Sequence, residues 1–388
     1  MTALIPTDAD DPALLQPALR HALEGGPALG FGMLADTPGS VPDGVAIVIA
    51  TSGSSGIPKR VALSAEALRA SAEATATRIG SGRWLLALPA GYVAGLQVLV
   101  RSIVAGTEPA TLGGRFSPDA FAEATLGMLR PASGSQSTGV PDLFTSLVPA
   151  QVATLLDAAD DNTAVRAALR AYRAILVGGQ ALAEPLRERA ADLGVHLVRT
   201  YGSTETSGGC VYDGVPLDVA AVRVLDGELR IAGPMLAEGY LDDAALTART
   251  FVRDEHGIRW YRTGDLGLVD DGVVRVHGRA DNVIVSGGIN ISLDRVERVV
   301  RTIPGLHQAV VVGVDDDRWG EASVIVAPRG EALRRSEAEQ LSHARDAVAE
   351  ALGRHARPTR LILVDELQTL PSGKPDREAI RRVVAGLR

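Results

Sequence analysis

A loop rich in glycine and hydroxyl groups, directly behind a run of apolar residues, constrains this chain most. The apolar run Val45 to Ala50 is typical of a buried strand. The residues that follow are Thr51, Ser52, Gly53, Ser54, Ser55, Gly56, Ile57, Pro58 and Lys59. Glycines let a backbone approach a polyphosphate, while hydroxyls, N–H groups and a lysine offer hydrogen bonds and charge to its oxygens. With a helix expected from the N-cap Ser64 to about Ile79, the order strand, loop, helix predicts binding of a nucleoside triphosphate.

The loop differs from a Walker A loop. There the lysine follows a glycine and precedes Ser or Thr, whereas Lys59 lies between Pro58 and Arg60. A P-loop kinase or ATPase is therefore disfavoured. Because a Ser/Gly-rich stretch alone is equally typical of a solvated linker, the interpretation depends on further motifs.

Composition excludes some classes of function. The 388 residues predict two or three structural units, and 39 Lys and Arg against 47 Asp and Glu give a net charge of −8 without a basic stripe. Nucleic-acid binding is not expected. Apolar segments stay short of the roughly 20 residues that span a bilayer, residues 1–15 are acidic, and the single Cys210 cannot form an internal disulfide. We expect a cytoplasmic protein without membrane insertion, and the sequence leaves a homo-oligomer open.

Strand-like and helix-like segments alternate through the first half. Strands are expected at 84–88 and 174–177, and helices at 95–104 and 184–193, so the pattern predicts an α/β domain of mixed, largely parallel sheets. Beyond Tyr201, short strands between Gly and Asp turns predict a small β-rich subdomain. Residues 1–44 contain several prolines and are expected to form short helices and loops.

A domain boundary is predicted at Asp281. Residues 1–280 would form the N-terminal ATP- and acid-binding domain, and residues 281–388 a small, mobile α+β C-terminal domain. The C-terminal part is expected to contain helices at 293–301 and 336–352 and strands near 310–314 and 323–326.

Four further motifs follow the loop in order. They are Tyr201-Gly202-Ser203-Thr204-Glu205-Thr206, Tyr261-Arg262-Thr263-Gly264-Asp265, Gly278-Arg279-Ala280-Asp281 and Pro371-Ser372-Gly373-Lys374. Together they resemble the adenylate-forming superfamily, which includes acyl- and aryl-CoA synthetases, luciferases and the adenylation domains of peptide synthetases. The resemblance spans roughly residues 45 to 380. It implies that a carboxylate attacks the α-phosphorus of ATP to give an acyl-adenylate and pyrophosphate, after which a thiol displaces AMP.

The resemblance also implies which residues bind ATP. The loop would hold the β- and γ-phosphates, Tyr201 would stack on adenine, and Asp265 would accept both ribose hydroxyls. Arg279 would contact ribose or phosphate, although either Asp265 or Arg279 could instead be half of a structural ion pair. The full set is Thr51, Ser52, Gly53, Ser54, Ser55, Gly56, Lys59, Gly178, Gly179, Gln180, Tyr201, Gly202, Ser203, Thr204, Asp265 and Arg279.

Three residues are expected to act in catalysis. Glu205 would coordinate Mg²⁺ and Thr204 would hydrogen-bond the α-phosphate. Lys374 would stabilise the α-phosphate and the attacking carboxylate oxygen by its charge, and only in adenylation. An exposed solubility lysine and a surface glutamate are the alternatives for Lys374 and Glu205.

For the second half-reaction the resemblance implies a rotation of the small domain. The domain would turn about the hinge Asp281, withdraw Lys374, and present Gly287 and Gly288 to the pantetheine of CoA. The alternative for the two glycines is a tight turn.

The acid is the least constrained part. Segments 88–102, 146–156 and 177–181 are most similar to the o-succinylbenzoate–CoA ligase family of menaquinone biosynthesis, which commonly has His where this chain has Tyr92. o-Succinylbenzoate keeps a second carboxylate after activation, so its pocket needs a cation or several donors. Arg101 is the first candidate and Arg199 the second, with a surface role as the alternative for Arg101. The pocket would also be shaped by Tyr92, Ser207 and Gly208.

Three functions remain open for the chain. The first is an o-succinylbenzoate–CoA ligase, with ATP and CoA as cosubstrates and Mg²⁺ as cofactor. The second is another aryl- or acyl-CoA synthetase, or a stand-alone adenylation enzyme that loads a carrier protein. The third is a non-catalytic nucleotide-binding relic, which intact Lys59, Glu205, Asp265, Arg279 and Lys374 disfavour.

Overall fold

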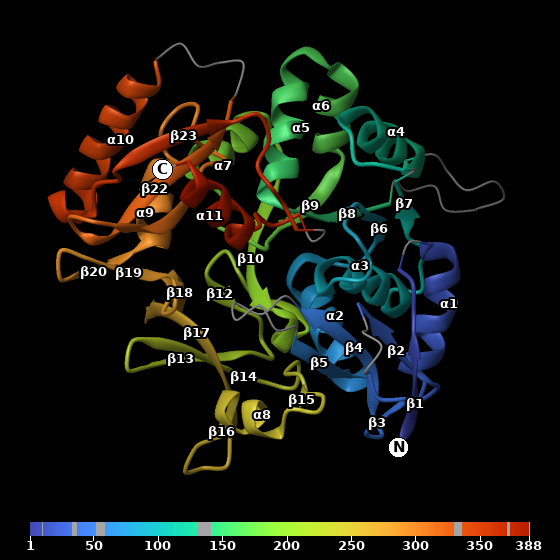
Figure 1. Ribbon diagram of the computed structural model, residues 1–388. Helices are drawn as coiled ribbons and strands as arrows, with labels where there is room; N and C mark the ends of the chain where they lie inside the picture. Colours follow the sequence, from blue (N-terminus) through green and yellow to red (C-terminus); the bar gives the residue numbers. More distant parts are fainter. Residues whose placement is uncertain are drawn as a thin grey trace.

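The computed structural model describes residues 1–9, 11–32, 37–51, 59–112, 114–129, 141–329, 336–370 and 373–387. Within them, β-sheets form the frame of an N-terminal part and of a smaller C-terminal part, shown in orange to red in Figure 1. The α/β fold class is confirmed. The predicted phosphate contacts Ser52, Gly53, Ser54, Ser55 and Gly56 lie outside the described residues, as do Pro371 and Ser372.

The first sheet joins strands from distant parts of the sequence. Its order is β15 (Gly239–Tyr240), β5 (Lys59–Ser64), β4 (Val45–Thr51), β2 (Ala28–Phe31), β1 (Thr2–Pro6) and β3 (Ser40–Val41). β4 is buried from Val45 to Ile49, as its apolar run predicts, and it pairs antiparallel with β5. Thr51 lies opposite Lys59, so the described residues on either side of 52–58 lie at the same end of the β4–β5 pair.

The order strand, loop, helix was wrong at one point. Strand β5 lies between the loop and helix α2 (Ala65–Ile79), so the loop joins two antiparallel strands. The helix itself begins where predicted, because Ser64 Oγ accepts a hydrogen bond from the Ala67 N–H at 3.3 Å. The N-terminus of α2 is therefore separated from the loop by a strand.

The second sheet is mixed and largely parallel. Its order is β12 (Val215–Pro216), β11 (Gly208–Tyr212), β10 (Leu197–Ser203), β9 (Tyr172–Val177), β8 (Leu143–Leu147), β6 (Arg83–Leu86) and β7 (Ala110–Thr111). Strands β10 to β7 pair in parallel and β11 pairs antiparallel with β10. Neighbouring residues point to opposite faces, so Phe144 belongs to one core and Leu143 to another.

Helices cover both faces of this sheet. The core that contains Phe144 is completed by α1 (Pro12–Leu23), α2 and α3 (Val93–Val104) and extends to the first sheet. The core that contains Leu143 is completed by α4 (Pro118–Met128), α5 (Pro149–Asp161), α6 (Thr163–Arg170) and α7 (Glu184–Asp192). The carboxyl ends of the central strands therefore stay free for a site.

The predicted β-rich subdomain is confirmed. Its sheet has the order β13 (Ala221–Leu225), β14 (Glu228–Ala232), β17 (Arg259–Asp270) and β16 (Phe251–Arg253), and β18 (Val273–Arg279) pairs with β17. Helix α8 (Ala244–Thr250) precedes β16. The long β17 carries the Tyr261 motif, and β18 ends at Arg279.

The C-terminal part has its own sheet. The order is β20 (Ile289–Ser292), β19 (Val283–Ser286), β22 (Gly320–Pro328) and β21 (Val310–Asp316), and β23 (Arg360–Val364) pairs with β22. Helices α9 (Leu293–Val300) and α10 (Glu337–Leu352), with the 3₁₀ turn η2 (Arg354–Ala356), complete one core and α11 (Arg377–Gly386) the other. The proposed boundary at Asp281 falls between β18 of the third sheet and β19 of the fourth.

The expectation for residues 1–44 was incomplete. Helix α1 is present, with Asp11 as its N-cap, but β1, β2 and β3 are strands of the first sheet. β2 has only four residues, all buried, and pairs in parallel with β1 and β4. Such a short segment is a strand because of its neighbours, which local sequence does not reveal.

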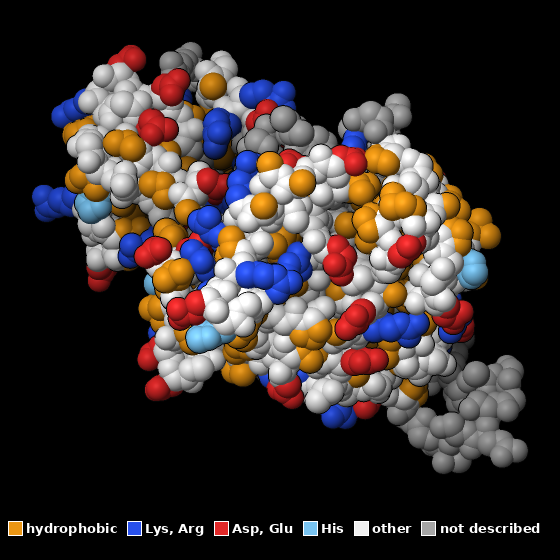
Figure 2. Space-filling model, turned by 90° about the horizontal axis from the view of Figure 1, so that it is seen from below, with side chains coloured by type: hydrophobic (Ala, Val, Ile, Leu, Met, Phe, Trp, Pro, Cys, Tyr) orange, Lys and Arg blue, Asp and Glu red, His pale blue; other side chains and the backbone are white. Residues whose placement is uncertain are grey.

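The described residues of the surface seen in Figure 2 form no large patch of a single charge. In Figure 2 basic, acidic and hydrophobic side chains are interspersed over the face that is seen from below. Among the described residues, helices are too short or too polar to cross a membrane.

Candidate active site

A sharp turn at the end of β10 positions Thr204 and Glu205. The 3₁₀ turn η1 (Thr204–Thr206) follows β10 directly, and Thr206 Oγ1 accepts a hydrogen bond from the Ser203 N–H at 2.8 Å. Ser207 closes the turn in the left-handed region with φ 51°. A Cβ on Gly202 would collide with the carbonyl of Gly208, so glycine is required where the two strands approach each other.

Tyr240 brings Glu205 and Lys59 together. The Tyr240 hydroxyl donates a hydrogen bond to Glu205 Oε1 at 2.9 Å, and the Lys59 ammonium lies 5.7 Å from the centroid of the same ring. The pairing of β15 with β5 holds this arrangement, because Tyr240 lies opposite Val61. One end of the phosphate loop and the proposed Mg²⁺ ligand therefore share one aromatic neighbour.

Asp265 lies close to Tyr201 and Arg279. Tyr201 OH donates to Asp265 Oδ2 at 2.6 Å, and Arg279 Nη1 lies 3.5 Å from Asp265 Oδ1. Burial raises the pKa of Asp265, against the Tyr201 hydrogen bond and the Arg279 charge, which lower it. Each carboxylate oxygen keeps a further lone pair, so the two ribose hydroxyls proposed as ligands still find acceptors.

Arg279 also contacts the proposed hinge. Its Nε and Nη2 bind Asp281 at 3.0 and 2.9 Å, while Nη1 donates to the Thr263 carbonyl at 2.8 Å. The backbone N–H of Arg279 donates to Asp294 at the start of α9. Arg279 thus contacts the ribose candidate Asp265, the hinge candidate Asp281 and the C-terminal part.

Lys374 enters the N-terminal part from a tight loop. Leu370 N donates to the Lys374 carbonyl at 2.7 Å and Gly373 N to the Leu370 carbonyl at 2.8 Å. A Cβ on Gly179 would stand 3.3 Å from Lys374 Cε, and one on Gly373 would stand 3.4 Å from Val148. The structure therefore places Gly373 and Lys374 beside Val148 and Gly179, which follow the ends of β8 and β9.

The charges around Lys374 identify its neighbours. Desolvation lowers the pKa of Lys374, and the carboxylates of Glu205 and Asp265 oppose that shift. Part of the side chain stays accessible to solvent, although protein atoms surround it closely enough to disfavour its charged form. Lys374 thus lies within electrostatic range of Glu205 and Asp265, and the resemblance expects these three residues in one adenylation site.

The three residues after β9 differ in environment. A Cβ on Gly178 would meet the Thr200 hydroxyl, Gly179 adopts φ 83°, and Gln180 Oε1 accepts a hydrogen bond from Arg301 Nη2 at 3.4 Å. Arg301 is buried at the end of α9. Sequence reasoning missed it, because an arginine in the last turn of a short helix is usually exposed.

The residues proposed around the acid are only partly together. Tyr92 is half-buried at the N-terminus of α3, and burial raises its pKa. Gly208 faces Gln97 Cγ, whereas the Ser207 hydroxyl is fully buried and donates to the Met235 carbonyl at 2.9 Å. Ser207 therefore shapes the pocket through its backbone.

Gln97 is a residue that sequence reasoning missed. Its Nε2 donates to the Ser207 carbonyl at 2.8 Å, and its buried Oε1 lacks a partner among the described residues. The signal was present, since Gln97 is a polar residue in the otherwise apolar first two turns of helix α3. A buried polar atom without a partner is costly and often marks a ligand contact.

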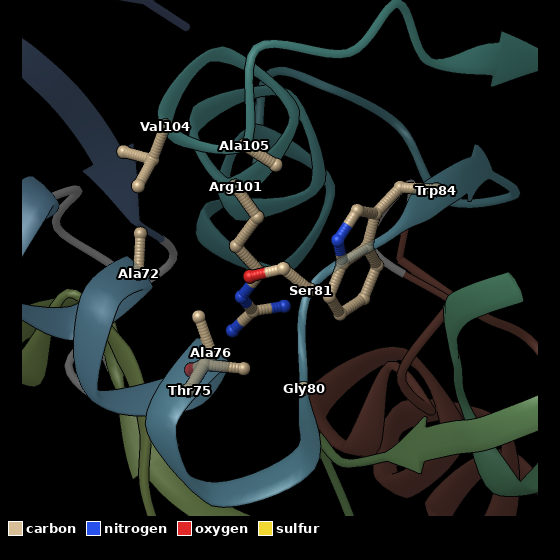
Figure 3. A pocket seen from close by; sticks show the side chains of 9 residues that line it. All are labelled: Ala72, Thr75, Ala76, Gly80, Ser81, Trp84, Arg101, Val104 and Ala105. Atoms are coloured by element: carbon tan, nitrogen blue, oxygen red, sulfur yellow. The ribbon is translucent and has the colours of Figure 1, made fainter. Parts of the chain in front are cut away.

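Arg101 lies on α3 and extends its side chain between α2 and β6. Its guanidinium faces the Trp84 ring at 4.9 Å, and Nη2 donates to Tyr212 OH at 3.4 Å. Figure 3 shows it pointing toward Thr75 and Ala76 across a cavity of about 10 Å³, which has room for about one water molecule. Nε is buried without a partner among the described residues, and desolvation lowers the pKa of Arg101.

Arg199 is placed differently. Its Nε binds Asp213 Oδ1 at 3.0 Å, and 41% of its side chain is exposed. The guanidinium is already neutralised at the surface. Of the two cations proposed for a second carboxylate, Arg199 is paired, whereas Arg101 is buried and has no acidic partner within the described ranges.

The two glycines proposed for CoA lie at the tip of the β19–β20 hairpin. Gly287 and Gly288 have φ 56° and 80°, and the Gly287 N–H donates to the Trp319 carbonyl at 2.8 Å. The hairpin lies on the side of the C-terminal part away from α5 (Figure 1). In this arrangement Lys374 is in the site and the glycines are outside it.

The site suits a metal that arrives with a nucleotide. Glu205 offers one carboxylate, and in the described ranges acidic, His and Cys side chains do not assemble in groups of three around a metal position. Mg²⁺ commonly takes one or two protein carboxylates and completes its shell with phosphate oxygens and water. Cys210 is not a nucleophile candidate, because burial raises the pKa of its thiol to about 12.

Comparisons with known proteins agree with this geometry. The model of the AMP-binding enzyme family matches residues 6–241, and the model of the AMP-binding enzyme C-terminal domain matches residues 295–374. A probable 2-succinylbenzoate–CoA ligase from Mycobacterium tuberculosis is 40% identical over 351 residues, which cover 89% of this chain and 86% of that protein. A 2-succinylbenzoate–CoA ligase from Bacillus anthracis is 29% identical over 87% of this chain and 70% of its own.

Solved structures are similar as well. O-succinylbenzoate coenzyme A synthetase (MenE) from Bacillus subtilis in complex with AMP has a TM-score of 0.69 and 25% identity, covering 87% of this chain and 69% of its own. ATP-bound MatB from Rhodopseudomonas palustris has a TM-score of 0.72 and 22% identity, covering 91% and 71%. At that identity the MatB match shows the fold alone.

Gly179→Ala is expected to disturb Lys374. The new Cβ would press on Lys374 Cε at 3.3 Å, and φ 83° adds strain of about 1 kcal/mol. We expect adenylate formation, measured as ATP–pyrophosphate exchange, to fall about ten-fold, because small misplacements of a catalytic group are costly.

Gly257→Ala is the matched control. Gly257 has φ 76° and would place its Cβ more than 4 Å from other atoms, so it adds the same strain without touching Lys374. Equal activity losses in the two variants would contradict the placement of Lys374 beside Gly179.

Proposed function

Because the chain belongs to the family of AMP-binding enzymes, we propose that it is an ATP-dependent ligase that activates 2-succinylbenzoate as an acyl-adenylate and transfers the acyl group to CoA. The observation that carries the adenylation step is the convergence of Lys374, Glu205 and Asp265 on one site. The acid is suggested by relatives named 2-succinylbenzoate–CoA ligases at 40% and 29% identity.

Adenylation would proceed by positioning and charge. In our proposal Tyr201 stacks on adenine, Asp265 accepts the ribose hydroxyls, and Gly178 to Gln180 border the base. Lys59, Thr51 and Ser203 lie toward the phosphates, with Arg279 beside the ribose. Lys374 and Thr204 stabilise the negative charge that develops on the α-phosphate when the acid oxygen attacks and pyrophosphate leaves. Mg²⁺ held by Glu205 would supply further neutralisation of phosphate charge.

The second half-reaction needs a different arrangement. Since Lys374 fills the site and Gly287 and Gly288 lie outside it, we propose that the C-terminal domain, residues 281–388, rotates about Asp281 after adenylation. At Asp281 the rotation would have to break the contacts with Arg279, which binds the Asp281 carboxylate through two nitrogens. The CoA thiol then attacks the acyl carbon and AMP leaves.

The acid would lie along one ridge of α3. Val93, Gln97 and Arg101 follow each other at four-residue spacing, so they line one face of the helix. Val93 and Gln97 adjoin Gly208, next to the Glu205 turn. Arg101 lies about 12 Å along the axis from Val93, at the far end of the ridge. We propose that the Arg101 guanidinium balances the charge of the second carboxylate, and that Gln97 and Tyr92 line the acid between the adenylation site and Arg101. The cavity beside Arg101 must widen to admit this carboxylate.

The acid preference is tested with purified protein, MgATP and CoA. With 2-succinylbenzoate, benzoates, fatty acids and amino acids as a panel, we expect AMP and CoA-thioester formation only with 2-succinylbenzoate. Lys374→Ala should lower adenylation by at least about 100-fold, because a charge aimed at the transition state is removed. Turnover of another acid would move the enzyme to a different ligase of the same family, and silence across the panel would favour carrier loading or a relic.

Arg101→Met and Arg199→Met compare the two cations. If Arg101 binds the second carboxylate, Arg101→Met should raise KM for 2-succinylbenzoate about ten-fold or more while KM for ATP stays unchanged. Arg199→Met should leave both constants alone, since Asp213 already pairs with Arg199. A loss of thermal stability in Arg101→Met without a change in KM would instead give Arg101 a structural role.

The lowered pKa of Lys374 predicts a pH effect. The cationic form acts, so adenylation is present below this pKa and is lost as pH rises through it. Because desolvation lowers the pKa, the loss should begin below the ordinary lysine value of about 10.4. Lys374→Arg is the control, since arginine stays protonated; the same alkaline limb in both enzymes would exclude Lys374 as its origin.

A further inference from the structure

Two arginines of the C-terminal part, Arg301 and Arg377, are arranged around the buried carboxylate of Glu297. Glu297 Oε1 lies 2.8 Å from Arg301 Nη2, and Glu297 Oε2 lies 2.7 Å from Arg377 Nη2. Glu297 Oε2 also accepts the Val311 N–H at 2.9 Å. Glu297 and Arg301 are each 6% exposed, so their charges depend on each other rather than on water.

This cluster touches the Lys374 loop at one end. Arg377 is the first residue of α11, three positions after Lys374, and its Nη1 donates to the Val311 carbonyl at 2.9 Å. Asp376 N donates to the Gln368 carbonyl at 2.9 Å, which closes the base of the loop. The loop that carries Lys374 is therefore fixed to α9 and β21 through Arg377 and Glu297.

At the other end the cluster touches the N-terminal part. Arg301 Nη2, held by Glu297, donates to Gln180 Oε1 at 3.4 Å. Gln180 follows Gly179, against which Lys374 lies. The Gln180 amide therefore links the segment beside Lys374 to Arg301.

We propose that Gln180, Arg301 and Glu297 form an interdomain clasp that holds Lys374 in the adenylation site. Arg301 is a positioning residue: it acts through the placement of the C-terminal part. The inference rests on the proposed function, in which one half-reaction needs this arrangement and the other needs it broken. A single hydrogen bond suits such a contact, because its net stabilisation of about 1 kcal/mol is easily released.

The clasp predicts different effects on the two half-reactions. Arg301→Met removes the bond to Gln180 and should slow adenylation about five-fold, measured by ATP–pyrophosphate exchange. Thioester formation from supplied acyl-adenylate and CoA, without ATP, should be unchanged or faster. Gln180→Glu offers Arg301 a carboxylate, so it should slow the thioester step relative to the wild type. A general structural defect would lower both steps together.

Two further variants separate the clasp from other roles. Gln180→Leu leaves every bond within the C-terminal part intact, so it tests the contact even if Arg301→Met folds poorly. If Gln180 and Arg301 act as a pair, combining both changes should cost no more than either alone. A loss confined to the KM for ATP in Gln180→Leu, additive with Arg301→Met, would assign Gln180 to adenine binding and overturn the clasp.

Arg357→Met is the matched control. Arg357 also lies in the C-terminal part, but it binds Asp346 at 3.0 Å on α10. We expect both half-reactions to be unaffected by its loss.

Hydrogen exchange tests the clasp without relying on activity. In the protein alone, peptides that contain Val148 and Lys374 should exchange faster in Arg301→Met and Gln180→Leu than in the wild type or Arg357→Met. Unchanged exchange in both variants would overturn the clasp. The two variants could exchange faster than the wild type while the wild type catalyses neither half-reaction. That result would instead overturn the proposed function.

Discussion

The position of one cation decides which chemistry this structure can perform. The ammonium of Lys374 is partly desolvated, and the carboxylates of Glu205 and Asp265 compensate for that cost. Those carboxylates come from different sheets: Glu205 follows β10 and Asp265 lies on β17. Their common orientation therefore exists only when the second and third sheets are in place and the C-terminal part is seated on them.

Aromatic side chains join these sheets at the site. Tyr201 on β10 binds Asp265 on β17 at 2.6 Å, and Tyr240 on β15 binds Glu205 at 2.9 Å. In both pairs the tyrosine hydroxyl gives a half-buried carboxylate a hydrogen-bond donor, and Asp265 also lies 3.5 Å from Arg279. The site is consequently preorganised for a cationic ligand or residue. Lys374 meets that requirement in this arrangement, and in our proposal it would leave the site when the C-terminal part rotates.

The sequence predicted the elements that local patterns determine. Helices with clear caps were placed within a residue or two: Ser64 caps α2, and Ser336 begins α10 in a capping box. The β-rich subdomain was also predicted, whereas the roles of Tyr201, Glu205, Asp265 and Lys374 stay predictions. Strands β1 and β2 were missed, and the helix expected directly behind the loop is preceded by β5. These strands depend on partners from elsewhere in the chain, which a local pattern cannot contain.

The misses at the site have the same origin. Arg301 and Gln97 lie on helices whose sequences suggest an exposed cation and a tolerated polar residue. Both side chains are buried and have specific partners: Glu297 neutralises Arg301, and Gln97 donates a hydrogen bond to the Ser207 carbonyl. Arg101 and Arg199 make the contrast within one residue type. Arg199 pairs with Asp213 in the turn after the neighbouring strand β11, whereas Arg101 faces Trp84 and Tyr212 and has no carboxylate partner in the part of the chain that the structure describes. A guanidinium held there without an acid retains attraction for one, which is why the acid specificity is best sought along α3.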